Sequence, residues 1–177
     1  MRIKQEIDLE RLHANRLAAI EASSGPIVAI PAHYPAGYHV KPHHHTRAQL
    51  LYARTGVVMV TSVVGRWMVP PEHALWIPPD IQHSVEMLAG VNMLSIYVQP
   101  GAVPDLPGEI RVVALDDLTR ALIVEAVAGW APEDEEDVTY PVIGVFRLLR
   151  GQIARVTAGA IFFQLEFACP WQLRVFS

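Results

Sequence analysis

The sequence predicts an all-β fold, an antiparallel barrel of short strands, followed by a helical segment. Residues 48–99 consist of short apolar, β-branched and aromatic runs separated by turns rich in Gly and Pro. Many short strands with such regular punctuation are typical of a barrel or a sandwich. Polar side chains at His43, His45, Gln49 and His83 can converge on one point only if the sheet curls round on itself. This convergence favours the barrel.

The totals indicate one domain with an ordinary core, because the chain has 177 residues. No apolar run reaches the roughly 18 residues of a membrane helix, and the start of the chain lacks a secretory signal. The single cysteine, Cys169, forms no internal disulfide. A net charge of -4 without a basic stripe argues against nucleic-acid binding by this chain. We therefore expect a cytoplasmic protein with no membrane contact.

The first segment, residues 1–24, is expected to form an arm or a short helix. Asp8 is a possible helix cap, and Gly25-Pro26 ends the segment. Four apolar residues recur at roughly helical spacing: Leu9, Leu12, Leu17 and Ile20.

Residues 25–100 are predicted to form the barrel. Several of its strands are apolar on both faces, so the outer face should be covered by a helix or by a second copy of the chain. We therefore expect a homodimer. The expected strands after the first apolar run at 27–30 are 49–54, 57–62, 66–69, 74–77, 84–88 and 91–98.

The rest of the chain divides into a helical segment and a divergent tail. Residues 101–137 are interpreted as a linker, a helix over 116–128 capped by Asp116, and an acidic loop. Residues 138–177 carry one acid against four arginines, and their apolar run at 160–168 fits a further strand or an aggregation-prone segment. Two interpretations of the tail stay open: a native segment packed on the barrel, or the product of a frameshift or truncation.

The histidines suggest a metal site. His43 and His45 are two residues apart, so on an extended strand they share a face, and Gln49 has the same parity. Three imidazoles including His83, with one amide oxygen, suit several divalent transition metals. Spacing cannot choose among them; we expect zinc or nickel first, with iron, copper or manganese as alternatives. Because this ligand set is neutral, a bound ion keeps its full charge and should attract an anionic ligand.

The alternative is that the histidines are surface residues at a strand end and His83 is a hydrogen-bonded barrel residue. Other candidate ligand contacts are Arg47, which suits a carboxylate, and Tyr52. Trp67 and Trp76 could line a pocket, although paired aromatic residues on facing strands are more often core.

The spacing of these residues resembles the cupins. Gly37, five residues, His43-His44-His45, three residues, Gln49, six residues and Gly56 match the first cupin motif, with Gln49 in place of the usual Glu. The second motif is matched in part, since Pro78 and His83 are in register but Asp80 stands where Gly is usual. The resemblance implies a cupin-type barrel, or jelly roll.

A finer resemblance covers about residues 25–130. Pro42 to Ala53, Trp67 to Pro71, Ala74 to Pro78 and Tyr97 to Pro100 are similar to the effector-sensing domain of AraC-type transcription regulators. In that family a carboxy-terminal pair of helix-turn-helix units binds DNA, and we find no such unit in this sequence. The resemblance implies a small-molecule-sensing domain that reaches DNA only through a domain absent from this chain.

The main alternative is a stand-alone metal-dependent cupin enzyme, such as a dioxygenase or an isomerase, in which the metal acts as a Lewis acid. Gln49 weighs against it, because iron and manganese enzymes of this fold more often use Glu. Fold alone does not decide between a sensor and an enzyme.

Overall fold

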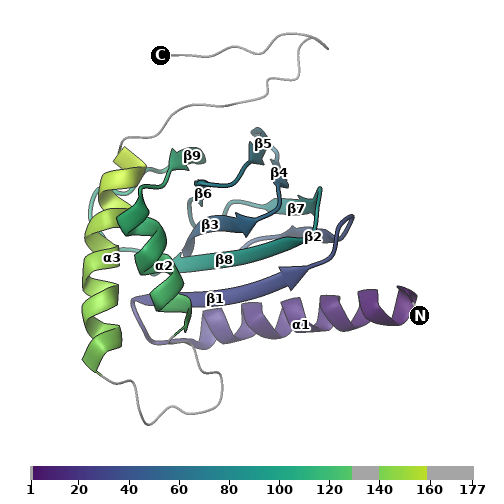
Figure 1. Ribbon diagram of the computed structural model, residues 1–177, viewed down its shortest axis with the longest axis horizontal. Coiled ribbons are helices and arrows are strands. Elements are labelled where there is room, and N and C mark those ends of the chain that lie inside the picture. The colour runs from purple at the N-terminus through teal and green to yellow at the C-terminus, as the bar shows by residue number, and fades with distance from the viewer. Residues whose placement is uncertain (1, 129–139, 159–177) are drawn as a thin grey trace.

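The structure is a computed structural model that describes residues 2–128 and 140–158. Within these ranges, two antiparallel sheets form a barrel, with one helix along its side and two across an outer face (Figure 1). The elements are α1 (Arg2–Ala22), β1 (Ile27–Tyr34), β2 (His39–His43), β3 (Ala48–Thr55), β4 (Val58–Ser62), β5 (Gly65–Val69), β6 (His73–Ile77), β7 (His83–Met87), β8 (Val91–Val98), β9 (Arg111–Ala114), α2 (Asp117–Ala128) and α3 (Tyr140–Ala158). The predicted antiparallel barrel with a helical carboxy-terminal segment is confirmed.

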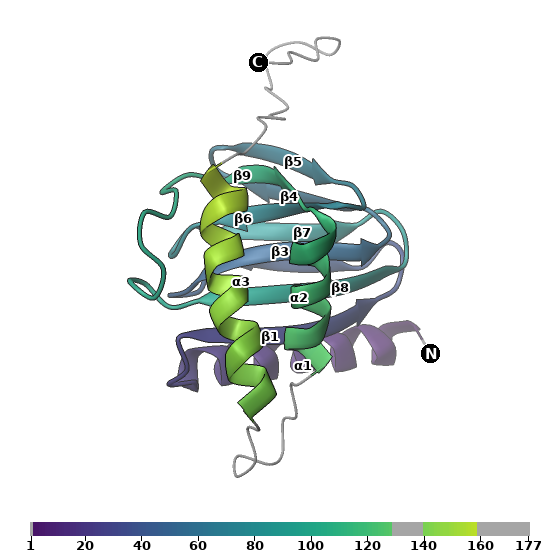
Figure 2. The same cartoon turned by 60° about the vertical axis from the view of Figure 1, so that its left-hand side comes forward.

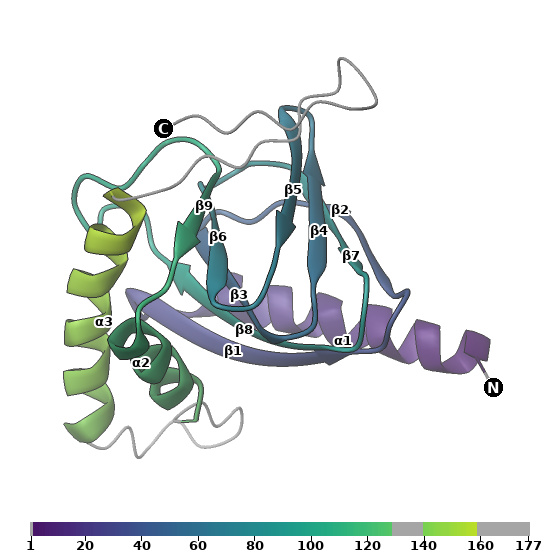
Figure 3. The same ribbon diagram turned by 45° about the horizontal axis from the view of Figure 1, so that its top comes forward.

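The two sheets face each other across an apolar interior. One has the strand order β1-β8-β3-β6-β9 and the other β2-β7-β4-β5, and Figure 3 shows them enclosing the interior from both sides. Leu51 and Leu75 of the first sheet pack there with Val60 and Met87 of the second, all fully buried. The six strands expected between residues 49 and 98 are all present. The short apolar runs and the regular turns between them therefore identified the barrel correctly.

The outer face of the five-stranded sheet is covered by helices of the same chain. Leu50 and Trp76 point outward from adjacent strands and pack with Ile123 of α2 and Ile153 of α3. Figure 2 shows both helices lying across this sheet. The apolar outer face thus has its cover without a second copy, so the homodimer stays a prediction that no longer rests on this face.

Helix α1 lies along the barrel beside β1 (Figures 1 and 3). Its Ile20 and Leu17 pack on Ile30 and Tyr97. Near its end, Glu21 accepts hydrogen bonds from the Thr46 backbone N (2.9 Å) and hydroxyl (2.6 Å). The predicted arm or short helix is therefore a helix attached to the barrel.

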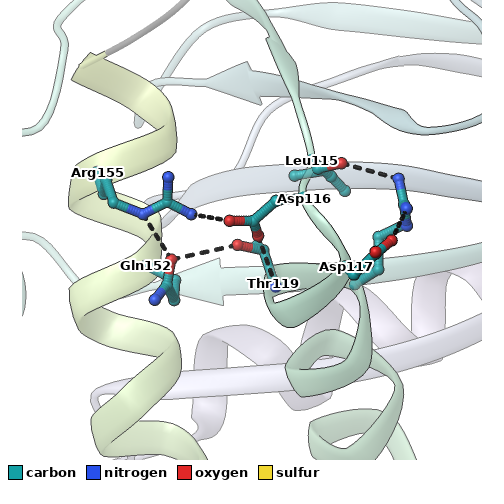
Figure 4. A network of polar contacts seen from close by, with 7 residues as sticks. Leu115, Asp116, Asp117, Thr119, Gln152 and Arg155 are labelled. Atoms are coloured by element: carbon teal, nitrogen blue, oxygen red, sulfur yellow. Dashed lines mark hydrogen bonds and ion pairs between the residues drawn. The ribbon is translucent and has the colours of Figure 1, made fainter.

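Beyond the barrel, the expected cap of α2 is confirmed, since the Thr119 backbone N donates to Asp116 Oδ1 at 2.8 Å. Figure 4 shows Arg155 of α3 joined to Asp116 and to Gln152, so the cap also links the two helices. Strand β9 and helix α3 were not expected. The acidic run at 133–137 and the apolar run at 160–168 lie outside the described residues.

The structure explains why a glycine is needed at position 56 of the first cupin motif. Gly56 has a φ of 83°, and a Cβ there would lie 2.5 Å from the Gly90 carbonyl oxygen. Any side chain would therefore clash with the neighbouring backbone.

None of the helices in the described part of the chain is both long and apolar enough to cross a membrane.

Candidate ligand-binding site

A cavity lies between the two sheets and under α1. The four-stranded sheet contributes His43 and His83 to its wall, the five-stranded sheet contributes Gln49, Ser95 and Tyr97, and α1 contributes His13 and Arg16. Its volume is about 30 Å³, which is room for about two water molecules. Three of the four predicted metal ligands line the cavity, and His45, the fourth, lies beside it.

The histidine rings are clustered. His43 and His83 are paired across β2 and β7, and their ring centroids are 4.4 Å apart. His45, in the loop after β2, has its ring centroid 5.2 Å from that of His83 and 6.2 Å from that of His43. His13 of α1 adds a fourth ring, 4.8 Å from His43. Strand β2 ends at His43, so His45 reaches the cluster from a loop and not from the expected strand.

Backbone carbonyls orient the three predicted ligands. The Nδ1 atoms of His43 and His83 lie 2.9 Å from Lys41 O and 2.8 Å from Ile81 O, and His45 Nδ1 contacts Arg47 O. Because a carbonyl only accepts, each Nδ1 carries the proton and each Nε2 presents a lone pair. The same arrangement orients histidines that bind metals. His83 Nε2 is buried without a hydrogen-bond partner.

Gln49 completes the donor set. Its Nε2 donates to Ser95 Oγ (3.0 Å) and Tyr97 OH (3.1 Å), which aims Oε1 at His45 Nε2, 3.1 Å away. In this orientation two lone pairs face each other, and a proton or a cation between them would relieve the repulsion. With the amide turned over, Nε2 would donate to His45 and Oε1 would accept from the two hydroxyls. The two orientations fit a site with and without a cation.

Burial keeps the imidazoles neutral. Burial lowers the pKa of His83 to about 3 and that of His13 to about 4, and it also lowers the pKa values of His43 and His45. A shared proton between His45 and Gln49 is therefore disfavoured near pH 7. Neutral imidazole is also the form that binds metals.

The candidate metal-binding atoms lie near one another but do not surround a single point at metal-binding distance. In the described ranges, no three His, Cys, Asp or Glu side chains converge closely enough to hold a metal as they stand. Two imidazoles sharing one ion at about 2.1 Å would have ring centroids roughly 4.5–5.5 Å apart. The separation of 6.2 Å between His43 and His45 exceeds this range. Rotation of these rings would be needed to close the set.

The turn of the second cupin motif forms with Asp80 in place of the usual Gly. It has a φ of 61°, in the left-handed region that Gly adopts most easily and Asp tolerates. Its backbone N donates to His45 O at 2.9 Å. Asp80 therefore preserves the turn, and its backbone connects the loop before His83 to the loop that carries His45.

The other predicted contacts lie away from the cavity. Arg47 is buried, and its guanidinium donates to Gly25 O (2.7 Å) and to Ser23 O. Tyr52 and Trp76 point to the helix-covered face, and Trp76 Nε1 donates to Pro107 O. Trp67 packs in the interior core. None of the four is among the residues that line the cavity.

His13 and Arg16 were missed. They lie three residues apart on one face of α1, beside Leu17 and Ile20, which pack on the barrel. Placing Leu9, Leu17 and Ile20 on a helical wheel would have put both polar residues on the buried side. The sequence therefore contained the signal.

Two facing antiparallel sheets and a cavity lined by histidines define a cupin-type ligand-binding barrel. Residues 24–165 match the AraC-like ligand binding domain. The chain belongs to this family. The match continues past Trp130, where the sequence resemblance was expected to end.

The chain is also similar to several individual proteins. The chain is 30% identical over 103 residues to the HTH-type transcriptional regulator NimR of Escherichia coli (strain K12), covering 58% of this chain and 37% of that regulator. ToxT of Vibrio cholerae O395, solved bound to (E)-4-(8-methylnaphthalen-1-yl)but-3-enoic acid, has a TM-score of 0.56 at 9% identity and covers 76% of this chain and 58% of that one. A cupin 2 conserved barrel protein from Salinispora arenicola CNS-205 has a TM-score of 0.40 at 17% identity, covering 46% and 70%.

Proposed function

We propose that this chain is the small-molecule-sensing domain of an AraC-type transcription regulator, with a divalent metal ion at its binding site. The family supports sensing, and the cavity supplies a place for the ligand. The observation that carries the proposal is the set of imidazole Nε2 lone pairs around this cavity, fixed by carbonyls on Nδ1. DNA binding would belong to a helix-turn-helix domain outside this chain.

The donor chemistry fits a metal. His43, His45, His83 and the Gln49 Oε1 would hold it, and the buried, unpartnered His83 Nε2 would gain a partner. A set of neutral nitrogen and oxygen donors suits zinc or nickel, with iron, copper and manganese as alternatives. When bound, the ion would supply a positive charge that attracts an anionic effector.

The cavity constrains how an effector enters. Pockets for drug-sized ligands measure about 300–1,000 Å³, and this cavity is far smaller at about 30 Å³. Its α1 wall includes His13, Arg16, Leu17 and Ile20. An effector of more than a few atoms would therefore have to move α1. Occupancy of the cavity would then be reported at the amino-terminal helix.

A ligand screen with a filled cavity tests the sensing proposal. Ala32→Leu adds apolar bulk to the cavity wall, and Ala36→Leu makes the same change at an exposed position. In a thermal-shift screen of small metabolites, with and without Zn²⁺ or Ni²⁺, a true effector should raise the Tm of wild type and of Ala36→Leu but not of Ala32→Leu. Val85→Ile is a milder filling variant if Ala32→Leu does not fold.

Equal stabilisation of the filled and control variants would place binding outside the cavity and contradict the proposal. Absence of any stabilising ligand, with no metal bound, would contradict it as well.

We also propose that the working protein is a cytoplasmic homodimer; sedimentation equilibrium should give twice the chain mass.

A further inference from the structure

One wall of the cavity carries a positive charge without a counter-ion. Arg16 of α1 lines the cavity, and its Nη1 is buried and makes no hydrogen bond. Among the ion pairs of the described residues, none includes Arg16. A guanidinium does not lose its proton in a protein, so the charge is permanent. A buried, unpaired donor on such a group is costly unless a ligand or water meets it.

The rest of the cavity wall does not offset this charge. The lining residues include three histidines, Gln49, Ser95 and two tyrosines, but no Asp or Glu. Burial has the largest effect on the pKa values of His13, Tyr34 and Tyr97: it lowers the first and raises the other two. The positive charge of Arg16 acts to lower all three. The interior is therefore electropositive on the α1 side and presents only neutral groups on the other.

Arg16 shares the cavity wall with His13 and Tyr34. The Tyr34 hydroxyl lies 3.3 Å from His13 Nδ1. Burial raises the pKa of Tyr34, and the charge of Arg16 acts against this rise. Tyr34 is itself buried and stacked on Tyr38, with ring centroids 5.2 Å apart. Nη1 is a hydrogen-bond donor without a partner on a guanidinium group whose residue lines the cavity.

From this arrangement we propose that Arg16 recognises the carboxylate of the effector, so that the sensed molecules are small organic acids. Arginine binds carboxylates through short, charge-assisted hydrogen bonds. A carboxylate is small enough for the 30 Å³ cavity, whereas the remainder of a larger acid would press on α1. The inference rests on the proposed sensing function, because it uses the same cavity.

Acetate and acetamide form a matched pair of probes, equal in shape and different in charge. Binding is followed by ¹H–¹⁵N NMR titration at constant ionic strength, with chloride replaced by acetate. Wild type should bind acetate at least tenfold more tightly than acetamide, and Arg16→Gln should lose at least tenfold of the acetate affinity. Arg16→Lys keeps the charge but not the planar fork and should be intermediate.

Arg11→Gln is the matched control. Arg11 lies on the same helix but is exposed and pairs with Asp8 at 3.4 Å, so its loss should leave acetate binding unchanged. Equal acetate binding by wild type and Arg16→Gln would overturn the inference, as would loss of binding in Arg11→Gln.

Two further results separate this inference from the sensing proposal. Acetate binding that His83→Asn abolishes and Arg16→Gln leaves intact would assign the anion to the histidines, which overturns the role of Arg16 and keeps the sensing site. Equal binding of acetate and acetamide, abolished by Ala32→Leu, would overturn acid selectivity alone. Acetate binding unaffected by Ala32→Leu would lie outside the cavity and overturn this inference, whereas the sensing proposal is decided by the thermal-shift screen.

Discussion

His83 shows how one buried side chain is prepared for a partner. Its Nδ1 is held by the Ile81 carbonyl at 2.8 Å, and its Nε2 is buried without a hydrogen bond. The side chain is 1% exposed, so a partner for Nε2 has to come from inside the barrel. A residue kept neutral and oriented in this way stabilises the fold less than a fully bonded one, and its free lone pair is the group that would hold the proposed cation.

The buried histidines predict a pH dependence of stability. Burial lowers the pKa of His83 to about 3 and of His13 to about 4, below the value near 6.5 expected in the unfolded chain. Between about pH 6.5 and pH 4 the unfolded state therefore binds more protons, so the free energy of unfolding falls as the pH falls. The slope can reach about 1.4 kcal/mol per pH unit for each histidine.

Urea unfolding of metal-free protein between pH 7 and pH 4.5 measures this slope. His83→Asn should reduce it by up to one proton, whereas His44→Asn, at an exposed neighbouring position, should not. A slope that is the same in wild type and His83→Asn would contradict the assignment.

Arg47 is predicted to stabilise the fold and not to bind ligand. Its guanidinium donates to the carbonyls of Ser23 and Gly25, which connect α1 to β1. Arg47→Met should lower the free energy of unfolding by about 2 kcal/mol, because charged hydrogen bonds to a nearly buried group are lost. Arg54→Met, at an exposed position, serves as the control in the same urea titration. A loss of effector affinity in Arg47→Met at unchanged stability would restore the original interpretation.

For single residues, the sequence indicated which residue types belong to the site but not always where their side chains point. His43, His45, Gln49 and His83 lie close together, as the motif spacing indicated, and their role as metal ligands stays a prediction. Tyr52 was expected at the pocket but points to the helix-covered face. It is three residues from Gln49, and residues at an odd separation on a strand point to opposite faces. The contacts of Arg47 could not be predicted, since they depend on the path of the α1–β1 connection.

At the scale of elements, α1 matters most because it closes the cavity. Glu21 receives two hydrogen bonds from Thr46, next to His45, while Glu10 pairs with Lys41 at 2.7 Å. The first contact connects the helix directly to the loop of the binding site. The second is an exposed ion pair, which contributes little.

We therefore predict unequal effects of removing the two glutamates. Glu21→Ala should speed amide hydrogen exchange severalfold in residues 17–22 and at Thr46, because the end of α1 loses its attachment. Glu10→Ala should change exchange little. Hydrogen exchange followed by mass spectrometry gives both results, and equal protection in the two variants would contradict this role of Glu21.

Most elements were predictable from periodicity, and two were not. Strand β9 has only four residues and is defined by pairing with β6, which no local pattern shows. Helix α3 contains Pro141, Gly144 and Gly151, which weaken a helical signal. Its buried residues Leu149, Ile153 and Val156 follow helical spacing all the same, so its helicity comes mainly from packing on the sheet and α2.

For the whole molecule, the same strands of the barrel both line the cavity and support the outer helices. Strand β3 turns Gln49 and Leu51 inward to the cavity and Leu50 and Tyr52 outward to α2 and α3. A change at the cavity therefore acts on a strand that also supports the outer helices. Sequence spacing suggested that side chains from distant strands converge in a closed barrel. It did not give the geometry of the site or the contribution of α1.

The measurement that tests the central claim most directly is calorimetric titration of metal-free protein with Zn²⁺ and Ni²⁺. Wild type and His44→Asn should each bind close to one ion per chain. His83→Asn and Gln49→Leu should weaken binding by at least about tenfold, the scale expected when a ligand of a metal site is lost. Absence of binding by wild type, or equal binding by His83→Asn and His44→Asn, would contradict the proposed site.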